Sequence, residues 1–300
     1  TGNTVLQNLN PEKYEARDVL ISRDGTWHHR GLPIDPRQVI SSNDVIFNAL
    51  HGEYGEDGRL QRLLTHYNIP YTGSRTLESA ICMNKEHAKR GLRHTDILMP
   101  KHRVLEVSTD IESRMQEAFD VFSPASVVKP ATAGSSVGVR IARNYGDFTG
   151  AVLNAFDTSP YVLVEEYIEG REATCGVVEG LRGEQTYSLL PIEIIPDEDR
   201  ELFDYDAKYN GKSQELCPGN FTKETSGELQ RLAKLVHETL NLRHYSRSDF
   251  VISPEGIYFL EVNTLPGLTP ESLIPKSLDA LGIPLPVFLD HVISLAMEQR

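Results

Sequence analysis

The stretch Glu261-Val262-Asn263-Thr264-Leu265-Pro266-Gly267 follows directly on the apolar run Ile257-Tyr258-Phe259-Leu260. The run has the composition of a buried strand, and a proline and a glycine end the stretch with a turn. Side chains alternate between the two faces of a strand, so Glu261 and Asn263 point to the same side. A carboxylate and a carboxamide therefore project together from one face of a sheet.

A second acidic segment, Arg247-Ser248-Asp249, lies just before this run. The sequence Ser253-Pro254-Glu255-Gly256 between the two segments predicts a turn, so Asp249 is expected on an adjacent strand beside Glu261. Magnesium is held by oxygen ligands from carboxylates, amides and phosphates. Any one of these acids alone is more often simply solvated. The three oxygen-bearing side chains together with Arg247 predict a magnesium and phosphate site.

The composition describes a globular chain that can bury substantial cores. Of its 300 residues 39% are hydrophobic, and at roughly 100–200 residues per domain two or three lobes are expected. The chain has 30 Lys and Arg against 43 Asp and Glu, a formal net charge of −13. Nucleic-acid binders present basic surfaces, so no nucleic-acid partner is expected. A small anionic ligand can still be bound by local clusters of lysine.

Apolar runs and cysteines indicate a cytoplasmic protein without a membrane partner. No apolar run approaches the ~20 residues that span a bilayer, and nothing at the amino end resembles a signal peptide. Cys82, Cys175 and Cys217 are odd in number and widely spaced, which is typical of a reducing compartment. We expect all three thiols to be inert.

Residues 1–82 are predicted to form a first α/β lobe. Short apolar runs at 18–22 and 44–50 are typical of strands in a buried parallel sheet, and 58–67 is predicted as a helix. Strand and helix alternation of this kind indicates an open α/β sheet. Proline and glycine at 68–74 interrupt the pattern, and the lobe is expected to end near Cys82.

The remaining chain is predicted to form a second lobe, 83–178, and a third, 179–300. Helices are expected at 84–94 and 223–241, and strands at 126–130, 137–142 and 161–167. The polar segment 195–222 has little periodicity. Structureless segments of this length are usually functional or disordered, so a long mobile loop or lid is expected there.

Two further motifs carry groups that suit a nucleotide. In Lys129-Pro130-Ala131-Thr132-Ala133-Gly134-Ser135-Ser136-Val137-Gly138, small residues allow backbone N–H groups to approach a phosphate, and Lys129 adds charge. The lysine precedes the glycine and the loop returns into a strand, so this is not a P-loop. Alone it would be an ordinary hairpin connection; beside the magnesium ligands it predicts a lid over phosphates.

Glu165-Glu166-Tyr167-Ile168-Glu169-Gly170-Arg171-Glu172 ends an apolar strand and can offer backbone groups to an adenine edge and a carboxylate to ribose hydroxyls. A solvated strand end explains it equally well.

His51-Gly52-Glu53-Tyr54-Gly55-Glu56 follows a predicted buried strand, where open α/β sheets place ligands. His51 and Glu56 are therefore candidates for substrate binding, although a lone histidine there is more often structural.

At this point the chain resembles the D-alanine–D-alanine ligases of the ATP-grasp superfamily. The resemblance covers nearly the whole chain, and the ordered set of motifs is more specific than any one of them. The motifs, in chain order, are His51-Gly52 with Glu56-Asp57-Gly58, Pro70-Tyr71-Thr72-Gly73-Ser74, Met83-Asn84-Lys85, Lys129-Pro130, Gly134-Ser135-Ser136-Val137-Gly138, Glu165, Gly170-Arg171-Glu172, Asp204-Tyr205-Asp206-Ala207-Lys208-Tyr209, Arg247-Ser248-Asp249, Glu261-Val262-Asn263-Thr264-Leu265-Pro266-Gly267 and Ser272-Leu273-Ile274-Pro275.

The resemblance implies an ATP-grasp fold and the ATP-dependent ligation of two D-alanines, with ADP and phosphate as products, for peptidoglycan precursor synthesis. ATP would lie between the second and third lobes. Two magnesium ions, with manganese as a possible replacement, would be held by Asp249, Glu261 and Asn263. The residues implied in nucleotide binding are Lys85 and Lys129 on the phosphates, Ser136 in the loop, Glu165 with the Tyr167 and Ile168 backbone near adenine, Glu172 on the ribose and Lys208 on the transferred phosphoryl group.

The same resemblance assigns catalytic and substrate roles. Arg247 and the Gly267 N–H would stabilise the oxyanion of a tetrahedral intermediate. Ser272 and the Leu273 N–H would hold the carboxylate of the second substrate, with His51 and Glu56 orienting substrate nearby. Tyr209 and Ser135 would latch the long loop closed, because water would otherwise hydrolyse the acyl phosphate.

The chain departs from the family pattern at its amino end. The family carries a first strand, a glycine-rich loop and a glutamate there, whereas residues 1–9 read as the end of a helix already under way. We expect a fragment that lacks this strand, because an open sheet without it would expose unpaired backbone; a shortened family member is the alternative. We expect the chain as given to bind ATP yet to ligate poorly, and ligation at family-typical levels by residues 1–300 alone would refute this expectation.

Two other functions stay open from the sequence. D-alanine–D-lactate ligase, or a ligase for another D-amino acid, is the nearest alternative, although Tyr209 in the Asp-Ala-Lys-Tyr loop favours the dipeptide product. A non-catalytic ATP-binding relative is the second, which the retained magnesium ligands and Lys208 disfavour. The resemblance also implies a homodimer formed through the first lobe.

Overall fold

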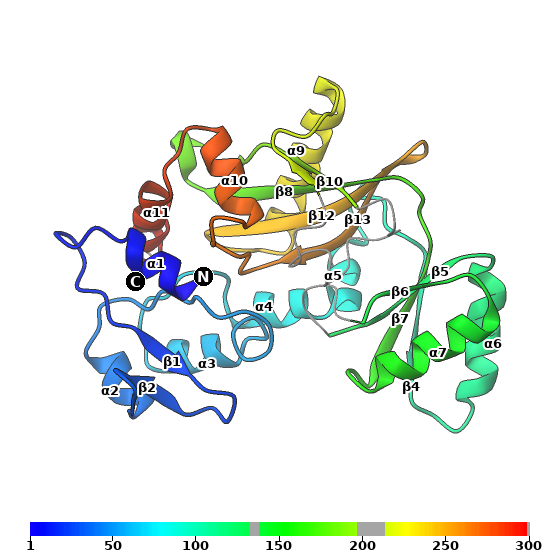
Figure 1. Ribbon diagram of the computed structural model, residues 1–300, viewed down its shortest axis with the longest axis horizontal. Coiled ribbons are helices and arrows are strands. Elements are labelled where there is room, and N and C mark those ends of the chain that lie inside the picture. Colours follow the sequence, from blue (N-terminus) through cyan, green and yellow to red (C-terminus); the bar gives the residue numbers. More distant parts are fainter. Residues whose placement is uncertain (133–137, 197–213, 299–300) are drawn as a thin grey trace.

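The computed structural model describes residues 1–132, 138–196 and 214–298. Within these ranges the strands form three sheets, of three, four and six strands. The sheets occupy separate regions of the molecule, and the helices α4 (Thr76–Met83) and α5 (Lys85–Leu92) lie between them (Figure 1).

The N-terminal region contains a small antiparallel sheet and three helices. The strands β1 (Val19–Ile21), β2 (Trp27–His29) and β3 (Leu32–Pro33) pair in chain order, and the helices are α1 (Gly2–Asn8), α2 (Pro36–Ser41) and α3 (Arg59–His66). Trp27 packs into a core with Val39 of α2 and Leu64 of α3. The helix predicted at 58–67 is confirmed as α3, which begins after Gly58 at φ 88°, a conformation that favours glycine.

The parallel sheet predicted for this region is present among the described residues only as one isolated bridge, between Ile46 and Tyr71. The strand predicted at 44–50 does not form, because Asn48 leaves the ladder: its N–H donates to the Thr72 hydroxyl at 3.0 Å, and its side chain accepts from the Leu50 N–H at 3.2 Å. Side-chain bonds of this kind compete with sheet pairing. The strand predicted at 18–22 exists as β1, but it pairs antiparallel with β2.

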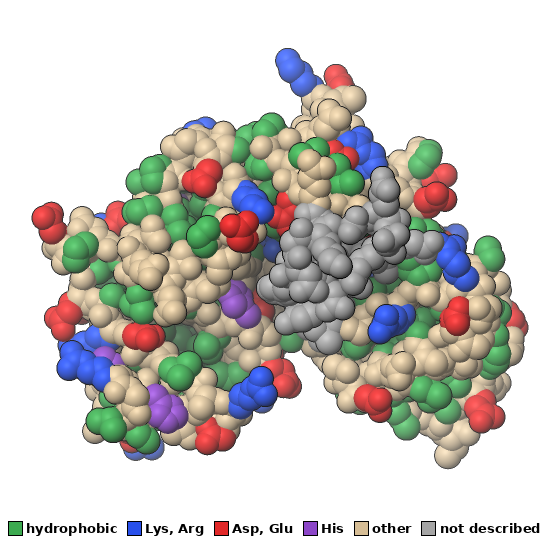
Figure 2. Space-filling view, viewed as in Figure 1, with side chains coloured by type: hydrophobic (Ala, Val, Ile, Leu, Met, Phe, Trp, Pro, Cys, Tyr) green, Lys and Arg blue, Asp and Glu red, His purple; other side chains and the backbone are tan. Residues whose placement is uncertain are grey.

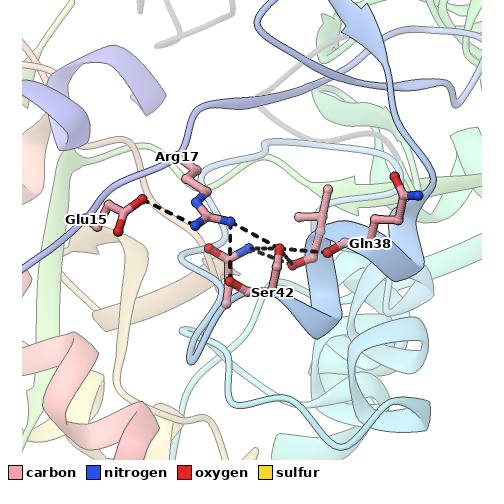
Figure 3. Close-up of polar contacts among 6 residues, drawn as sticks. Glu15, Arg17, Gln38 and Ser42 are labelled. Atoms are coloured by element: carbon pink, nitrogen blue, oxygen red, sulfur yellow. Dashed lines mark hydrogen bonds and ion pairs between the residues drawn. The ribbon is translucent and has the colours of Figure 1, made fainter.

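Arg17 ties the chain before β1 to the end of α2 (Figure 3). Its Nη1 donates to the hydroxyl of Ser42 at 3.2 Å and its Nη2 to Glu15 at 3.3 Å, while the Ser42 hydroxyl donates to the Gln38 carbonyl at 2.7 Å. The small sheet is thereby anchored to the helix that follows it.

The four-stranded sheet has the order β4-β7-β5-β6 and carries two helices on one face. Its elements are β4 (His102–Glu106), α6 (Ile111–Phe122), β5 (Ser126–Pro130), β6 (Arg140–Ala142), α7 (Tyr145–Phe156) and β7 (Tyr161–Glu166). Val128 and Val164 pack into the helix-covered core with Phe148 of α7. Their neighbours Lys129 and Glu165 therefore point to the opposite face. The strands predicted at 126–130 and 161–167 are confirmed, and the one at 137–142 is a strand only over Arg140–Ala142.

The six-stranded sheet has the order β11-β10-β8-β12-β13, with β9 paired to β8. Its strands are β8 (Arg171–Glu179), β9 (Thr186–Ser188), β10 (Ile192–Ile195), β11 (Gln214–Leu216), β12 (Tyr245–Ser253) and β13 (Gly256–Asn263). The boundary predicted at 178/179 falls inside β8, which pairs with β12 from Arg171 to Val178. This strand thus belongs wholly to the six-stranded sheet.

Helices cover both faces of this sheet. On one face α9 (Lys223–Thr239) and α5 pack against Cys175, Phe250 and Phe259. On the other side α10 (Leu273–Ala280) and α11 (Leu285–Glu298) pack against Tyr245 and Leu189. Among the described residues no single helix is long and apolar enough to cross a membrane; only α10 and α11 taken together meet the length, and they are bent by 109°.

The segment predicted as a long loop, 195–222, contains a strand. β11 pairs with β10, with Gln214 opposite Ile195, so the described residues on either side of 197–213 lie side by side. Residues 197–213 themselves lie outside the described ranges. The helix predicted at 223–241 is confirmed as α9, capped by the Thr222 side chain.

The helix predicted at 84–94 is confirmed as α5, and it contacts both large sheets. Its N-cap Asn84 accepts from the His87 N–H, and the Lys85 N–H donates to the Ala131 carbonyl at 2.9 Å, just after β5. Farther along the helix, Ala88 and Leu92 pack into the core of the six-stranded sheet. Side chains of α5 are thus placed where the two sheets approach each other.

Candidate functional site

Four predicted site side chains are neighbours on the adjacent strands β12 and β13: Arg247, Asp249, Glu261 and Asn263. Asp249 lies opposite Glu261, and Arg247 lies opposite Asn263. Residues directly opposite on antiparallel strands, and residues two apart on one strand, share a face of the sheet. The predicted neighbour relationship across the 253–256 turn is confirmed.

A β-bulge beside Asp249 sets the direction of Glu261. The register shifts between Asp249 and Phe250, so Leu260 is left without a partner opposite it. Phe259 and Val262, three residues apart, can therefore both pack into the core under α5 and α9. Bulges re-aim side chains in this way, and here Leu260 and Glu261 both line the cavity described below.

Asp249 is held in place from three directions. Arg247 donates to it through Nε and Nη2, each at 2.9 Å, in a bidentate pair. Thr174, on the neighbouring strand β8, donates its hydroxyl to Oδ1 at 2.6 Å, and the Asn263 amide approaches Oδ2 at 3.5 Å. Burial opposes the charge of Arg247, but Asp249 outweighs it and raises the pKa of the guanidinium.

Glu261 is paired with a cation from α5. Lys85 Nζ lies 3.1 Å from Glu261 Oε2, and the two side chains are 6% and 16% exposed. The carboxylates of Asp249 and Glu261 are thus stabilised by different cations, one from their own sheet and one from the helix between the sheets.

A cavity opens between the two large sheets and brings most of the predicted nucleotide residues together. Six of them line it: Lys85, Lys129, Glu165, Tyr167, Ile168 and Glu172. Asp249 and Glu261 line it as well, while apolar side chains including Val127, Val251 and Leu260 form much of the rest. Ligand sites are commonly concave and mostly apolar with a few polar groups, and this cavity fits that description.

A buried charge cluster lies at the wall formed by the four-stranded sheet. Glu165 meets Lys129 at 2.7 Å through Oε2 and Lys89 of α5 at 2.8 Å through Oε1. Burial favours the neutral acid, but the two ammonium groups outweigh it and lower the pKa of Glu165 to about 2. Burial lowers the pKa of Lys89, with Glu165 opposing. Of the three groups, Lys129 and Glu165 line the cavity, and Lys89 does not.

The two predicted substrate residues of the N-terminal region meet the 261–267 segment at Leu265. His51 Nδ1 lies 3.0 Å from the Leu265 carbonyl oxygen, and Glu56 accepts from the Leu265 N–H at 3.3 Å and from the Gly52 N–H at 2.6 Å. Burial lowers the pKa of His51. Burial also raises the pKa of Glu56 to about 7, against the two N–H donors and Arg247.

Gly267, Ser272 and Leu273 lie together next to α10. A Cβ on Gly267 would stand 2.6 Å from the Ser272 hydroxyl oxygen, so a larger residue here would require the hydroxyl or the turn to move. That hydroxyl also lies 2.8 Å from the Thr269 hydroxyl and accepts from the Thr269 N–H at 3.1 Å. Leu273 is the first residue of α10, where backbone N–H groups have no partner within the helix and suit an anion.

Four predicted site residues, Ser135, Ser136, Lys208 and Tyr209, lie outside the described ranges. Within those ranges, no group of three or more His, Cys, Asp and Glu side chains could hold a metal ion. The predicted magnesium set has two carboxylates and an amide, and these three do lie together.

Sequence reasoning missed two residues that the structure brings to the site, Thr174 and Lys89. Thr174 gave no signal in the sequence, since its role depends on β8 pairing with β12. Lys89 follows Lys85 by four residues, which places both on one helix face. This spacing is the sequence signal by which Lys89 could have been predicted as a neighbour of the site.

Solved structures define the class of this fold. A D-alanine–D-alanine ligase from Bacillus anthracis superposes with a TM-score of 0.82 at 32% identity, covering 99% of this chain and 91% of that one. The VanG D-Ala:D-Ser ligase from Enterococcus faecalis gives 0.85 at 29% identity, covering 97% and 92%. The fold is accordingly that of an ATP-grasp ligase.

The sequence comparisons identify the family. The model for the D-ala D-ala ligase C-terminus matches residues 92–294, and the model for the N-terminus matches residues 28–74. The D-alanine–D-alanine ligase of Syntrophobacter fumaroxidans is 38% identical over 300 residues, covering 99% of this chain and 92% of the relative. This chain belongs to the D-alanine–D-alanine ligase family.

Proposed function

We propose that this protein joins two molecules of D-alanine to D-alanyl-D-alanine, with ATP converted to ADP and phosphate. The observation that carries the proposal is the cavity between the sheets, which is lined by the carboxylates of Asp249 and Glu261 and by Lys85 and Lys129, groups that suit a polyanion with bound metal ions. The family and the similar ligases named above support the same activity. The product would serve peptidoglycan precursor synthesis.

ATP is the proposed nucleotide, and a B. anthracis ligase structure complexed with ATP, of TM-score 0.79 and 29% identity, supports it. Lys85 and Lys129 would contact the phosphates. Glu165 and the backbone of Tyr167 and Ile168 would contact adenine, and Glu172 would contact the ribose. All of these line one cavity, which is what a shared ligand requires.

The site also suits magnesium. Asp249, Glu261 and Asn263 supply the hard oxygen ligands that magnesium selects, and manganese accepts the same set. A carboxylate has about four acceptor positions, of which Arg247 takes two and Thr174 one, so Asp249 can offer the fourth to a cation in place of the 3.5 Å contact with the Asn263 amide. Two such ions would neutralise phosphate charge next to the transferred group.

The reaction begins with one D-alanine carboxylate. One of its oxygens takes the γ-phosphoryl group and ADP is released. The deprotonated amine of the second D-alanine then attacks the acyl carbon, forming a tetrahedral oxyanion that loses an amine proton and collapses to the amide by expelling phosphate. Arg247 and the Gly267 N–H would stabilise that oxyanion. His51 and Glu56 would orient substrate, and Ser272 with the Leu273 N–H would bind the carboxylate of the second substrate. Roles for Ser135, Ser136, Lys208 and Tyr209 stay predictions.

The identity of the second substrate is the open alternative. The similarity to a D-Ala:D-Ser ligase makes D-serine a candidate beside D-lactate. A non-catalytic ATP-binding protein is a further alternative, but it would have no use for an arginine held in bidentate geometry beside the metal ligands.

Phosphate release with D-alanine and ATP, followed by mass spectrometry of the product, tests the proposal. Release that needs D-alanine and yields the dipeptide would support it. Arg247→Ala should slow release about 100- to 1000-fold while ATP still binds, and the exposed Arg231→Ala should not. ATP binding without D-alanine-dependent release would indicate a non-catalytic protein. Mixtures of D-alanine with D-serine or D-lactate identify the second substrate by the mass of the product. A pH series further separates D-lactate, since an amine must be deprotonated to attack and a hydroxyl nucleophile responds differently.

We further propose that the protein acts as a homodimer in the cytoplasm. The three free cysteines, of which Cys82 and Cys175 are buried, suit a reducing compartment. Acidic and basic side chains are interspersed over the face drawn in Figure 2. Light scattering of the purified protein would measure its oligomeric state.

A further inference from the structure

Lys89 is a buried lysine that lies behind the cavity wall. It follows Lys85 by one helical turn on α5, and its side chain is 1% exposed. Lys85 lines the cavity, whereas Lys89 does not. Lys89 instead meets Oε1 of Glu165 at 2.8 Å.

The pairing of Glu165 is divided between two lysines. Lys129 meets Oε2 at 2.7 Å, so each carboxylate oxygen has its own ammonium group. Glu165 and Lys129 both line the cavity. The carboxylate of Glu165 is therefore held between two ammonium groups, one that lines the cavity and one that does not.

The Lys89–Glu165 pair also connects the two walls of the cavity. Ala88 and Leu92, on either side of Lys89, pack into the core of the six-stranded sheet. Glu165 lies on β7 of the four-stranded sheet. Because a buried ion pair seldom stabilises a fold more than apolar residues of the same volume would, its presence here favours a role in arranging the site.

We propose that Lys89 is a positioning residue for nucleotide binding, which acts through Glu165 to orient the carboxylate and Lys129 toward ATP. The inference rests on the proposed function only in that the cavity binds ATP. Lys89 itself touches neither nucleotide nor substrate.

The test is the binding of ATP to the whole protein, measured by equilibrium titration, together with steady-state kinetics. Lys89→Met keeps the length and removes the charge. It should raise the dissociation constant and the KM for ATP roughly tenfold, the loss expected for one charge-assisted contact, with the KM for D-alanine unchanged. Lys89→Arg keeps the charge and should recover part of the affinity. Lys223→Met, at an exposed lysine of α9, is the matched control and should change neither constant.

A double-mutant cycle distinguishes positioning from general loss of structure. If Lys89 acts through Glu165, Lys89→Met should weaken ATP binding much less in a Glu165→Gln background than in the wild type. Equal losses in both backgrounds would overturn the inference, as would unchanged ATP affinity in Lys89→Met. If Lys89→Met does not fold, the same cycle with Lys89→Arg decides. If the wild type binds ATP but makes no dipeptide, the proposed ligase activity is wrong. The ATP affinities of the variants still test the inference about Lys89 in that case.

Discussion

Asp249 and Glu261 lie directly opposite each other on β12 and β13, and each is paired with a different cation, Arg247 and Lys85. Two carboxylates side by side repel each other unless positive charge is near. The pairing with cations offsets this repulsion and lets the two carboxylates lie side by side on one face of the sheet.

Replacing Asp249 with Asn keeps the shape of the side chain and removes one negative charge from this pair. Dipeptide synthesis should fall on the order of 100-fold or more, because a metal ligand is lost at the transferring phosphoryl group. A magnesium titration of the rate should show half-saturation at higher metal concentration. Asp279→Asn, at an exposed position of α10, should leave both unchanged. An unaltered magnesium dependence in Asp249→Asn would argue against the metal assignment.

Glu56 should make the stability of the protein depend on pH near neutrality. Burial raises its pKa to about 7, from an ordinary value of 4.5. Between these two values the folded chain holds a proton that the unfolded chain has lost, so the free energy of unfolding falls as pH rises through this window. Glu56→Gln cannot titrate and should lose this component of the dependence.

Urea unfolding of the wild type and Glu56→Gln at a series of pH values measures the effect. From pH 4.5 to 7 the free energy of unfolding of the wild type should fall relative to that of Glu56→Gln. Above that range the difference between the two proteins should stay constant. Glu12→Gln, at an exposed side chain, serves as control. A difference that stays constant across the window would show that Glu56 keeps an ordinary pKa.

Gly267→Ala should impair the site by a steric route. The new Cβ would stand 2.6 Å from the Ser272 hydroxyl oxygen, so either the turn or the side chain must shift. Since Ser272 is proposed to bind the second substrate, the KM for D-alanine should rise. The double variant with Ser272→Ala relieves the contact without restoring binding. Gly227→Ala is the control: its Cβ meets nothing within 4 Å, and alanine should stabilise α9 by about 0.5–1 kcal/mol.

The sequence predicted those parts of the site that depend on local pattern. The hairpin of β12 and β13 followed from an apolar run, a turn signal and the alternation of Glu261 with Asn263, and it is confirmed. From the sequence, His51 and Glu56 are only candidates for substrate binding. Their meeting with Leu265 was not predicted, because more than 200 residues separate the two segments.

The rest depended on contacts that no local pattern encodes. Residues 44–50 have the sequence pattern of a buried strand. In the structure the Asn48 N–H donates to the Thr72 side chain, and this contact cannot be predicted from the local pattern. The bulge at Leu260, which lets Phe259 and Val262 share a core, cannot be seen from alternation alone. Lys89 finds Glu165 only because α5 packs on one sheet and β7 belongs to the other.

The central claim is that a D-alanine carboxylate is activated by the γ-phosphoryl group of ATP in the cavity between the sheets. D-alanine labelled with ¹⁸O in its carboxylate tests it most directly, since the oxygen that takes the phosphoryl group leaves with it when the amine attacks. The account predicts one labelled oxygen in the inorganic phosphate for each dipeptide formed. Phosphate without label, or AMP and pyrophosphate as products, would contradict it.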